Sequence, residues 1–281
     1  AGGGVGGGML TSSPSSVFLR EAPEPKVPRN IFSPTLRLTQ VDEEEVARQL
    51  TLLDSELYRC IRPAELLNQS WAHPHLQHRS PNLCAFIRRF NSVSTWVISA
   101  ILRPERARQR ARAMTRFIRI AEHCLALNNF HTLMAILGAL TSAPVHRLRH
   151  TKAEMERSTL AKVREFSDLM RSDSSFAAYR NKLSGISPPA IPYIGVFLKD
   201  LVFIEDGNPD VVQDGLINFS KRTLLYSVIQ RLQQFQMEEY NLQSVYQIAE
   251  LLKLSTVVNT DEGEMFHLSL LREPRNATSV P

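Results

Sequence analysis

The chain has 281 residues, of which 43% are hydrophobic and 22% charged, a composition that supports a substantial core and excludes an intrinsically disordered protein. A net charge of +5 is too small to choose between nucleic acid, an anionic membrane and an acidic protein as partner. No apolar run reaches the roughly 18 residues of a membrane span, and three widely spaced cysteines predict reduced thiols in a cytoplasmic setting. The first residue is Ala1 rather than Met, which indicates an excerpt or a processed chain.

Residues 1–40 are rich in glycine, serine and proline. Such a composition cannot bury enough apolar surface to offset the entropy lost on ordering, so we expect a flexible linker or tail. The glycines at its start are not a phosphate-binding loop, because no Gly-Lys-Ser/Thr follows them and no strand precedes them. A second short tail is expected over residues 277–281.

The folded part is predicted to begin near Asp42, which can cap a helix whose first turn holds Glu43 to Glu45. Helical spacing of apolar residues, or a helix start at proline, then predicts helices over 46–61, 63–71, 81–102, 104–126, 132–140 and 153–183. Strict alternation is nearly absent, and only residues 266–271 are candidates for a short ribbon. The chain is therefore predicted to be all-α, a single large helical domain.

Two local patterns refine this prediction. Over residues 104–126 the apolar side chains fall on one side of the helix, and arginines coat the other. The polar break at Asn128 and Asn129 is expected to satisfy the helix ends at a junction, and this interpretation is favoured over a catalytic role for Asn129 or His131.

The chain is organised around residues 188–236. The prolines over 188–192 keep the entry extended, so a helix can begin only after Pro192. Its apolar residues form one stripe from Ile194 to Ile204, and a second apolar stripe runs from Leu225 to Phe235. The two segments predict a helical hairpin.

The connection between these helices gathers acidic groups. Glu205, Asp206 and Asp210 flank Gly207, which is expected to end the first helix. A helix of roughly 20 Å is long enough to project beyond a globular body. The alternative is that the pair is an ordinary core unit with a solvated acidic turn.

Motifs of covalent catalysis and metal binding are absent. The chain has no Gly-x-Ser-x-Gly, no Cys-x-x-Cys, no His-Glu-x-x-His and no Rossmann or Walker glycines. His73, His75 and His78 lie close together, but a proline-containing loop fixes no ligand geometry. No metal or cofactor is expected, and the residues alone indicate a helical interaction domain with a protruding hairpin.

Eight short strings carry a resemblance to a known family. They are Thr51–Tyr58, Ser80–Leu83, Leu127–Phe130, Arg147–Thr151, Pro188–Tyr193, Gly207–Pro209, Ile217–Lys221 and Glu273–Asn276. In order and spacing they resemble the catalytic domain of Ras-family guanine-nucleotide exchange factors, the Ras-GEF domain. The resemblance covers about residues 41–276.

The resemblance implies a bowl-shaped helical domain that grips a small GTPase of the Ras, Rap or Ral type. Its hairpin is expected to enter beside the bound nucleotide and to accelerate GDP release without covalent chemistry, because it binds the nucleotide-free state better than the loaded state. The family also implies a cytoplasmic protein that is peripheral to membranes when recruited through regions outside this chain. No nucleic-acid partner is expected, since no aromatic platform accompanies the arginines.

Two hairpin residues match positions that act on the nucleotide site in the family. Val202 stands where the family commonly has a leucine that crowds the magnesium site. Asp206 stands where it often has a glutamate that disturbs the phosphate-loop contacts. Both side chains are shorter than this leucine and glutamate, and related exchange factors vary at these positions too. Lys199, which shares their helix face, is assigned to GTPase binding.

On the bowl, Ile87, Arg88, Met134 and Tyr193 match positions that hold the second switch of the GTPase, and Thr141 stands where one relative has an asparagine. Arg88 can reach a carboxylate, whereas for each apolar residue simple core packing is the alternative. Two functions stay open: an exchange factor, or a scaffold that binds the GTPase without exchange. The substitutions at Thr141 and at the two hairpin positions favour the second.

Overall fold

The computed structural model describes residues 21–258 and 261–277 and contains helices and turns. Within these residues no strand forms, and the only β pairing is two isolated bridges. The all-α prediction is confirmed. The helices are α1 Glu43–Arg59, α2 Pro81–Leu102, α3 Ala107–Ala126, α4 Phe130–Thr141, α5 Ala143–His146, α6 Arg149–Ala153, α7 Arg157–Leu169, α8 Ala177–Ser184, α9 Ile194–Gly207, α10 Phe219–Gln234, α11 Tyr246–Ser255 and α12 Glu262–Arg272.

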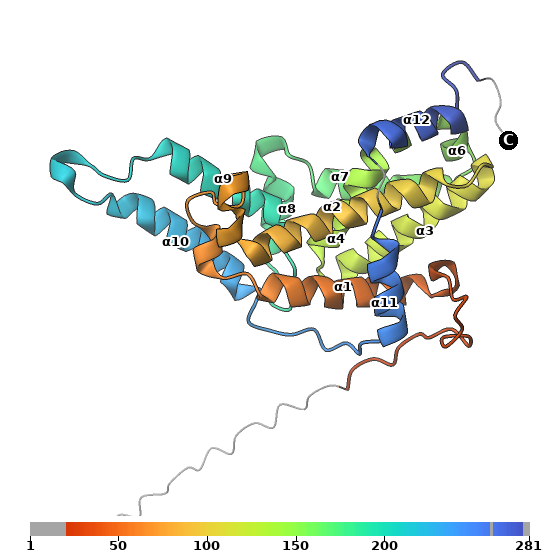
Figure 1. The fold of residues 1–281 in the computed structure, drawn as a ribbon, viewed down its shortest axis with the longest axis horizontal. Coiled ribbons are helices and arrows are strands. Elements are labelled where there is room, and N and C mark those ends of the chain that lie inside the picture. Colours follow the sequence, from red (N-terminus) through yellow and green to blue (C-terminus); the bar gives the residue numbers. More distant parts are fainter. Residues whose placement is uncertain (1–20, 259–260, 278–281) are drawn as a thin grey trace, which may run out of the picture.

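The body is built on four helices, α1 to α4, which pack on one another (Figure 1). Their apolar faces meet in a core that includes Leu50, Phe86, Ile101, Phe130 and Ile136, all fully buried. Helix α11 lies on α1, and α12 lies on α2 and α5. The pair α9 and α10 extends from the opposite end of the body, where it forms the longest projection among the described residues (Figure 1).

Most helices begin and end close to where the sequence predicts. Asp42 caps α1 by accepting a hydrogen bond from the Glu44 amide at 2.9 Å, and Asn129 caps α4 by accepting one from the Thr132 amide at 3.0 Å. The helix expected over 63–71 is shorter, a 3-10 turn at Pro63–Leu66.

The expected ribbon over residues 266–271 is wrong, since these residues lie inside α12. Asp261 accepts from the Glu264 amide at 2.7 Å, and the Glu264 side chain reaches back to the Asp261 amide. This capping box fixes a helix start that outweighs the short alternation.

One arginine of α3 does not lie on the exposed side that the sequence predicts. Arg110 is fully buried and donates to the Thr151 hydroxyl at 2.9 Å and to the Glu273 carboxylate at 3.4 Å. Burial alone lowers the pKa of Arg110, and the carboxylate partner opposes that effect. Arg110 therefore connects α3 to the chain that follows α12.

Residues 21–40 belong to the segment expected to be a linker, and their described contacts place them along α1 and α3. The Lys26 amide donates to Glu45 at 2.9 Å, and Arg116 of α3 donates to the Leu38 carbonyl at 2.6 Å. The rest of that segment, residues 1–20, and most of the tail expected over 277–281 lie outside the described residues. Among the described helices, none is long and apolar enough to cross a membrane.

Candidate functional site

The hairpin is held to the body at its base. At the entry, the Phe130 amide donates to the Ile191 carbonyl at 2.9 Å, and the Ile191 amide donates to the Asn128 carbonyl at 3.0 Å. At the exit, the Tyr58 hydroxyl of α1 donates to the Leu232 carbonyl of α10 at 2.7 Å. The junction between α3 and α4 thus sets where α9 begins, and α1 sets where α10 ends.

The hairpin also carries a lysine whose role the sequence did not reveal. Lys221 of α10 is only 3% exposed, and its ammonium lies 2.7 Å from a Glu205 carboxylate oxygen and 3.1 Å from that of Asp210. It also donates to the Glu205 carbonyl at 3.1 Å. One cation therefore joins the end of α9, the connecting loop and the start of α10.

The pKa values at this lysine follow from its contacts. Burial lowers the pKa of Lys221, but its hydrogen bonds to Glu205 and Asp210 outweigh burial and raise it overall. The hydrogen bond from Lys221 holds the pKa of the Asp210 carboxyl below its usual value. Both groups are charged near neutral pH, so the acidic connection that the sequence predicts is partly neutralised within the chain.

The predicted hairpin residues differ in their surroundings. Val202 is half-buried and packs against the core, whereas Asp206 and Lys199 are exposed. Asp206 accepts a hydrogen bond at 2.7 Å from the side-chain amide of Gln69, in the loop between α1 and α2. The Lys199 ammonium lies 5.5 Å from the centre of the Phe203 ring, and that ring is 63% exposed.

The connection between α9 and α10 presents apolar side chains to solvent. Val211 and Ile217 form an isolated antiparallel bridge, so the loop folds back on itself. Leu216, Ile217 and Phe219 are 64%, 67% and 78% exposed. Exposed apolar side chains that gather at one place indicate contact with another molecule.

Three of the predicted bowl residues meet around one aromatic cluster. The Tyr193 ring lies 5.6 Å from that of Phe90, and the Phe90 ring lies 5.2 Å from that of His131. Ile87 lies one turn before Phe90 on α2, and Met134 lies one turn after His131 on α4, both half-buried. We call the surface formed by Ile87, Met134 and Tyr193 the Tyr193 surface.

Tyr193 is held in place by its backbone. Its amide donates to the Tyr179 hydroxyl at 2.8 Å, and Tyr179 is fully buried in α8. Burial raises the pKa of Tyr193 above its ordinary value, so the phenol stays neutral. The tyrosine that precedes α9 therefore couples the hairpin to the body.

The remaining predicted residues lie apart from this cluster. Arg88 of α2 is exposed and forms none of the ion pairs found among the described residues, so its guanidinium is available to a partner. Thr141 is exposed at the last position of α4, about 10 Å along the helix from Met134. Its hydroxyl donates to the Leu137 carbonyl at 2.8 Å, which uses its hydrogen within the helix.

Beneath the Tyr193 surface lies a buried polar network that the sequence did not predict. Asp54 of α1 is fully buried and accepts from Asn129 at 3.0 Å, from Arg89 at 3.2 Å and from the Thr132 hydroxyl. It ties α1, α2 and the start of α4 together. The feature of the sequence that could have indicated this network is Asp54, a single aspartate among the apolar positions of a predicted helix.

His131 lies on top of that network without a polar partner. Its ring stacks on Phe86 with centroids 3.7 Å apart, and neither ring nitrogen has a hydrogen-bond partner among the described residues. Burial lowers the pKa of His131 to about 4, with the nearby Asp54 carboxylate opposing that shift. The imidazole is neutral near pH 7 and behaves as an aromatic core residue.

The described residues offer no group of three His, Cys, Asp or Glu side chains that can hold a metal ion. What the arrangement offers is a surface for a macromolecule. A projecting hairpin with apolar and acidic groups stands beside an aromatic surface and an unpaired arginine, which suits recognition of another protein rather than of a small substrate.

Comparison with known proteins gives the family. A model of the RasGEF domain matches residues 45–223. Ras guanine nucleotide exchange factors J and I of Dictyostelium discoideum are 48% identical over 270 residues and 49% over 263 residues, which cover 96% and 93% of this chain. Rap guanine nucleotide exchange factor 1 of Homo sapiens is 38% identical over 255 residues, 91% of this chain.

The chain spans only 33%, 32% and 23% of the lengths of these three relatives. The RasGEF match over residues 45–223 nevertheless includes nearly all of α1, the whole of α2 to α9 and the start of α10, so both the Tyr193 surface and the hairpin tip fall within it. The resemblance drawn from short sequence strings is therefore confirmed, and the chain belongs to the RasGEF domain family.

Proposed function

We propose that the chain is a guanine-nucleotide exchange factor for a Ras-family small GTPase, and that residues 41–276 form its catalytic domain. The observation that carries the proposal is the hairpin, which is anchored at its base to α1 and α4 and projects with exposed apolar residues at its tip. The names of the relatives, which are Ras and Rap exchange factors, support the same activity.

In this proposal the GTPase rests on the Tyr193 surface and contacts Arg88. The Tyr193 surface supplies half-buried apolar area, and Arg88 supplies an unpaired cation beside it. Arginine and tyrosine next to buried apolar groups are typical of residues that dominate binding energy. Thr141 on α4 and Lys199 on α9 lie outside the Tyr193 surface, and we assign both to the edge of the contact with the GTPase.

The hairpin is proposed to act on the nucleotide site. With the base fixed, Val202 and Asp206 face the region where the GTPase holds magnesium and the phosphates, contacts on which tight nucleotide binding depends. A hairpin that favours the nucleotide-free state lowers the barrier to release through differential binding alone. No bond to the nucleotide is made or broken.

The test is the release of a fluorescent GDP analogue from Ras, Rap and Ral, each loaded separately and mixed with this chain. We expect acceleration with at least one of them. No acceleration with any, at protein concentrations that saturate binding, would defeat the proposal. The three substrates also decide which GTPase the chain prefers.

The second candidate is a scaffold of the same fold that binds without exchange. The observation that favours it is that Thr141 uses its hydroxyl within α4 and that the side chains of Val202 and Asp206 are short. Co-purification with a nucleotide-free GTPase separates the two functions. A stable complex with no faster release identifies the scaffold, whereas faster release identifies the exchange factor.

A further inference from the structure

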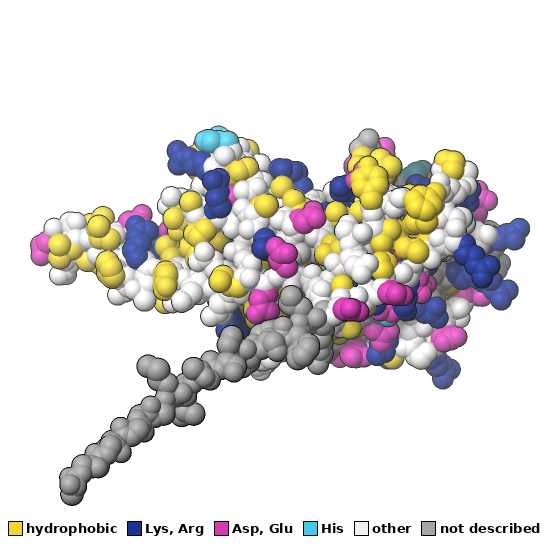
Figure 2. All heavy atoms as spheres, turned by 90° about the horizontal axis from the view of Figure 1, so that it is seen from below, with side chains coloured by type: hydrophobic (Ala, Val, Ile, Leu, Met, Phe, Trp, Pro, Cys, Tyr) yellow, Lys and Arg dark blue, Asp and Glu magenta, His cyan; other side chains and the backbone are white. Residues whose placement is uncertain are grey.

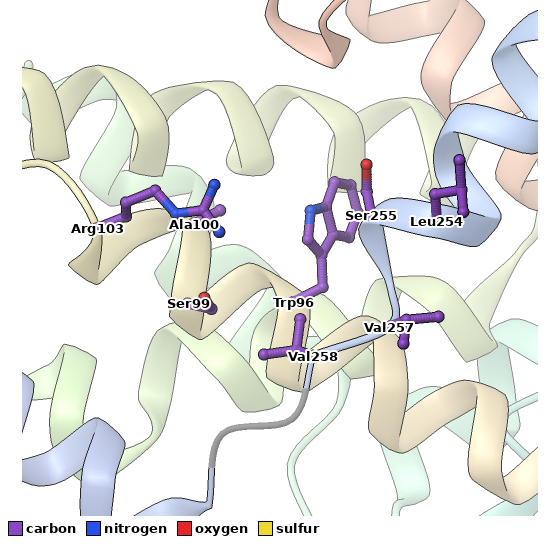
Figure 3. A pocket seen from close by; sticks show the side chains of 8 residues that line it. All are labelled: Trp96, Ser99, Ala100, Arg103, Leu254, Ser255, Val257 and Val258. Atoms are coloured by element: carbon purple, nitrogen blue, oxygen red, sulfur yellow. The ribbon is translucent and has the colours of Figure 1, made fainter.

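A second surface lies at the end of the molecule away from the hairpin. An open groove of about 1150 Å³ runs between α3, the segment 36–39, the start of α7 and α11. A smaller hollow of about 340 Å³ adjoins it and shares Trp96, Ala100, Arg103 and Ser255 with it (Figure 3). We call the two together the arginine groove.

The floor of the arginine groove is apolar and its rim is basic. Val46, Ala111, Phe117, Ile120 and Leu251 are among the residues of the floor. Six arginines but only three glutamates line the groove. Figure 2 shows hydrophobic side chains gathered at this end of the molecule, with both basic and acidic side chains beside them.

Most arginines of the rim form no ion pair within the described part of the chain. Arg103, Arg108, Arg112 and Arg119 are exposed, and none of them forms an ion pair with the described residues, whereas Arg116 pairs with Glu43 at 3.1 Å. The residues outside the described part contain no Asp or Glu. Glu154 and Glu156 also line the groove, and neither forms an ion pair with these arginines in the described part of the chain.

The spacing of the arginines indicates an elongated occupant. Arg108, Arg112 and Arg119 are separated by four and seven residues, which places them on one face of α3 over about 16 Å. An acidic helix laid along the groove can present carboxylates at the same spacing. A membrane is a poorer fit, because most apolar residues of the floor, such as Val46, Phe117 and Ile120, are buried and only Leu254 and Val257 project from the surface.

Trp96 adds an independent sign of a ligand. Its side chain is only 8% exposed and packs edge-on against Phe117 with centroids 5.0 Å apart. The indole N–H has no hydrogen-bond partner among the described residues, and the ring lines the hollow with its nitrogen toward the Arg103 side in Figure 3. The indole nitrogen is not among the fully buried atoms that lack a partner, so it is open to the hollow and can donate to a ligand that enters there.

From these observations we infer that the arginine groove binds an acidic amphipathic peptide segment of a protein partner. Carboxylates of that segment pair with the arginines of the rim and accept from the Trp96 indole. Its apolar side chains cover the floor of the groove and the exposed Leu254 and Val257, which are 71% and 70% exposed. The site lies away from the hairpin, so its occupant and a GTPase can bind together.

The test is fluorescence anisotropy with a fluorescein-labelled helical peptide of about 15 residues that carries leucines on one face and glutamates on the other. The control peptide has glutamine in place of each glutamate. We expect saturable binding of the acidic peptide and weaker binding of the control. Raising the ionic strength from about 0.01 M to about 0.15 M should weaken binding, because the Debye length falls from about 30 Å to about 8 Å.

Variants assign the binding to the groove. R108Q/R112Q should weaken peptide binding about fivefold or more, whereas R79Q/R164Q, which removes the same charge from exposed arginines elsewhere, should not. W96F keeps the aromatic packing and removes the indole donor, so binding should fall about three- to tenfold. Circular dichroism confirms that each variant folds.

Several results would overturn the inference: no saturable binding, equal binding of the glutamine peptide, or unchanged binding by R108Q/R112Q or W96F. Binding to phosphatidylserine vesicles that is lost in R108Q/R112Q, without peptide binding, would assign the groove to an anionic membrane instead. The experiment contains no GTPase, so failure of the proposed exchange activity would leave its outcome unaffected.

Discussion

The ammonium of Lys221 holds the tip of the hairpin together, and removing it should loosen the tip without unfolding the body. K221M keeps the length of the side chain but loses the contacts to Glu205 at 2.7 Å and Asp210 at 3.1 Å. Glu205 is 11% exposed, and one of its carboxylate oxygens already has no partner among the described residues. The variant leaves this carboxylate without its cation.

The magnitude follows from burial. Breaking a fully buried pair costs about 3–5 kcal/mol, but Asp210 is 62% exposed and water reaches the site, so we expect about 1–2 kcal/mol. That is about a 5–30-fold rise in the opening equilibrium of the tip. Because the contacts join only α9, the loop and α10, the melting temperature of the body should change little.

The assay is amide hydrogen exchange by mass spectrometry. Peptides over residues 203–225 should exchange faster in K221M, and peptides from α2 and α4 should not. R222Q is the matched control, because Arg222 contacts Asp210 at 2.8 Å on the exposed side. Equal exchange over 203–225 in K221M and in the unmodified chain would show that Lys221 does not hold the tip together.

The same contacts fix the pH range of this effect. The pKa of Asp210 is lowered in the folded state, so its contribution is present above the ordinary value of about 3.9 and is lost as the pH falls through the lower folded value. The pKa of Lys221 is raised, so its contribution is present below about 10.4 and is lost as the pH rises through the higher folded value. The protection of the hairpin tip against amide hydrogen exchange should therefore stay constant between about pH 5 and pH 9.

Three further predictions concern the body. E273Q should destabilise the folded state by about 3 kcal/mol and lower its melting temperature by about 6–12 °C, because it leaves Arg110 buried without its carboxylate. The control E264Q should destabilise it by less than about 1 kcal/mol, and equal melting temperatures of the two variants would contradict the prediction. Between pH 7 and pH 5 the free energy of unfolding, measured with urea, should fall by about 2 kcal/mol more in the unmodified chain than in H131N. The reason is that the pKa of His131 is about 4 in the folded state, so protons bind the imidazole of the unfolded state first. Parallel pH profiles of the two proteins would contradict this. R88A should leave stability within about 0.5 kcal/mol and weaken GTPase binding by about tenfold, and unchanged binding would remove Arg88 from the contact.

The hairpin is the feature that the sequence predicts best, for reasons that are local. The prolines before Ile194 and the glycine at its end limit α9, and two periodic stripes mark the faces that pack. The caps at Asp42 and Asn129 are local as well, because a side chain reaches an amide only two or three residues away.

Contacts between distant parts of the chain could not be predicted in this way. Asp54 meets Asn129 and Thr132 across 75 and 78 residues, and Arg110 meets Glu273 across 163. A helical pattern predicts which face of a helix is apolar. It does not predict which charged residue is buried in the core because it pairs with another buried polar group. Arg110 was for this reason expected on the exposed side of α3.

In the proposed function the hairpin drives nucleotide release and does more than bind the GTPase. The most direct measurement is the rate of fluorescent GDP release at saturating concentrations of the chain and of V202A/D206A, on whichever of Ras, Rap or Ral responds. The unmodified chain should accelerate release about tenfold or more, equivalent to about 1.4 kcal/mol of barrier, and the variant should lose most of this acceleration while still binding nucleotide-free GTPase. Equal release rates for the two proteins would contradict it.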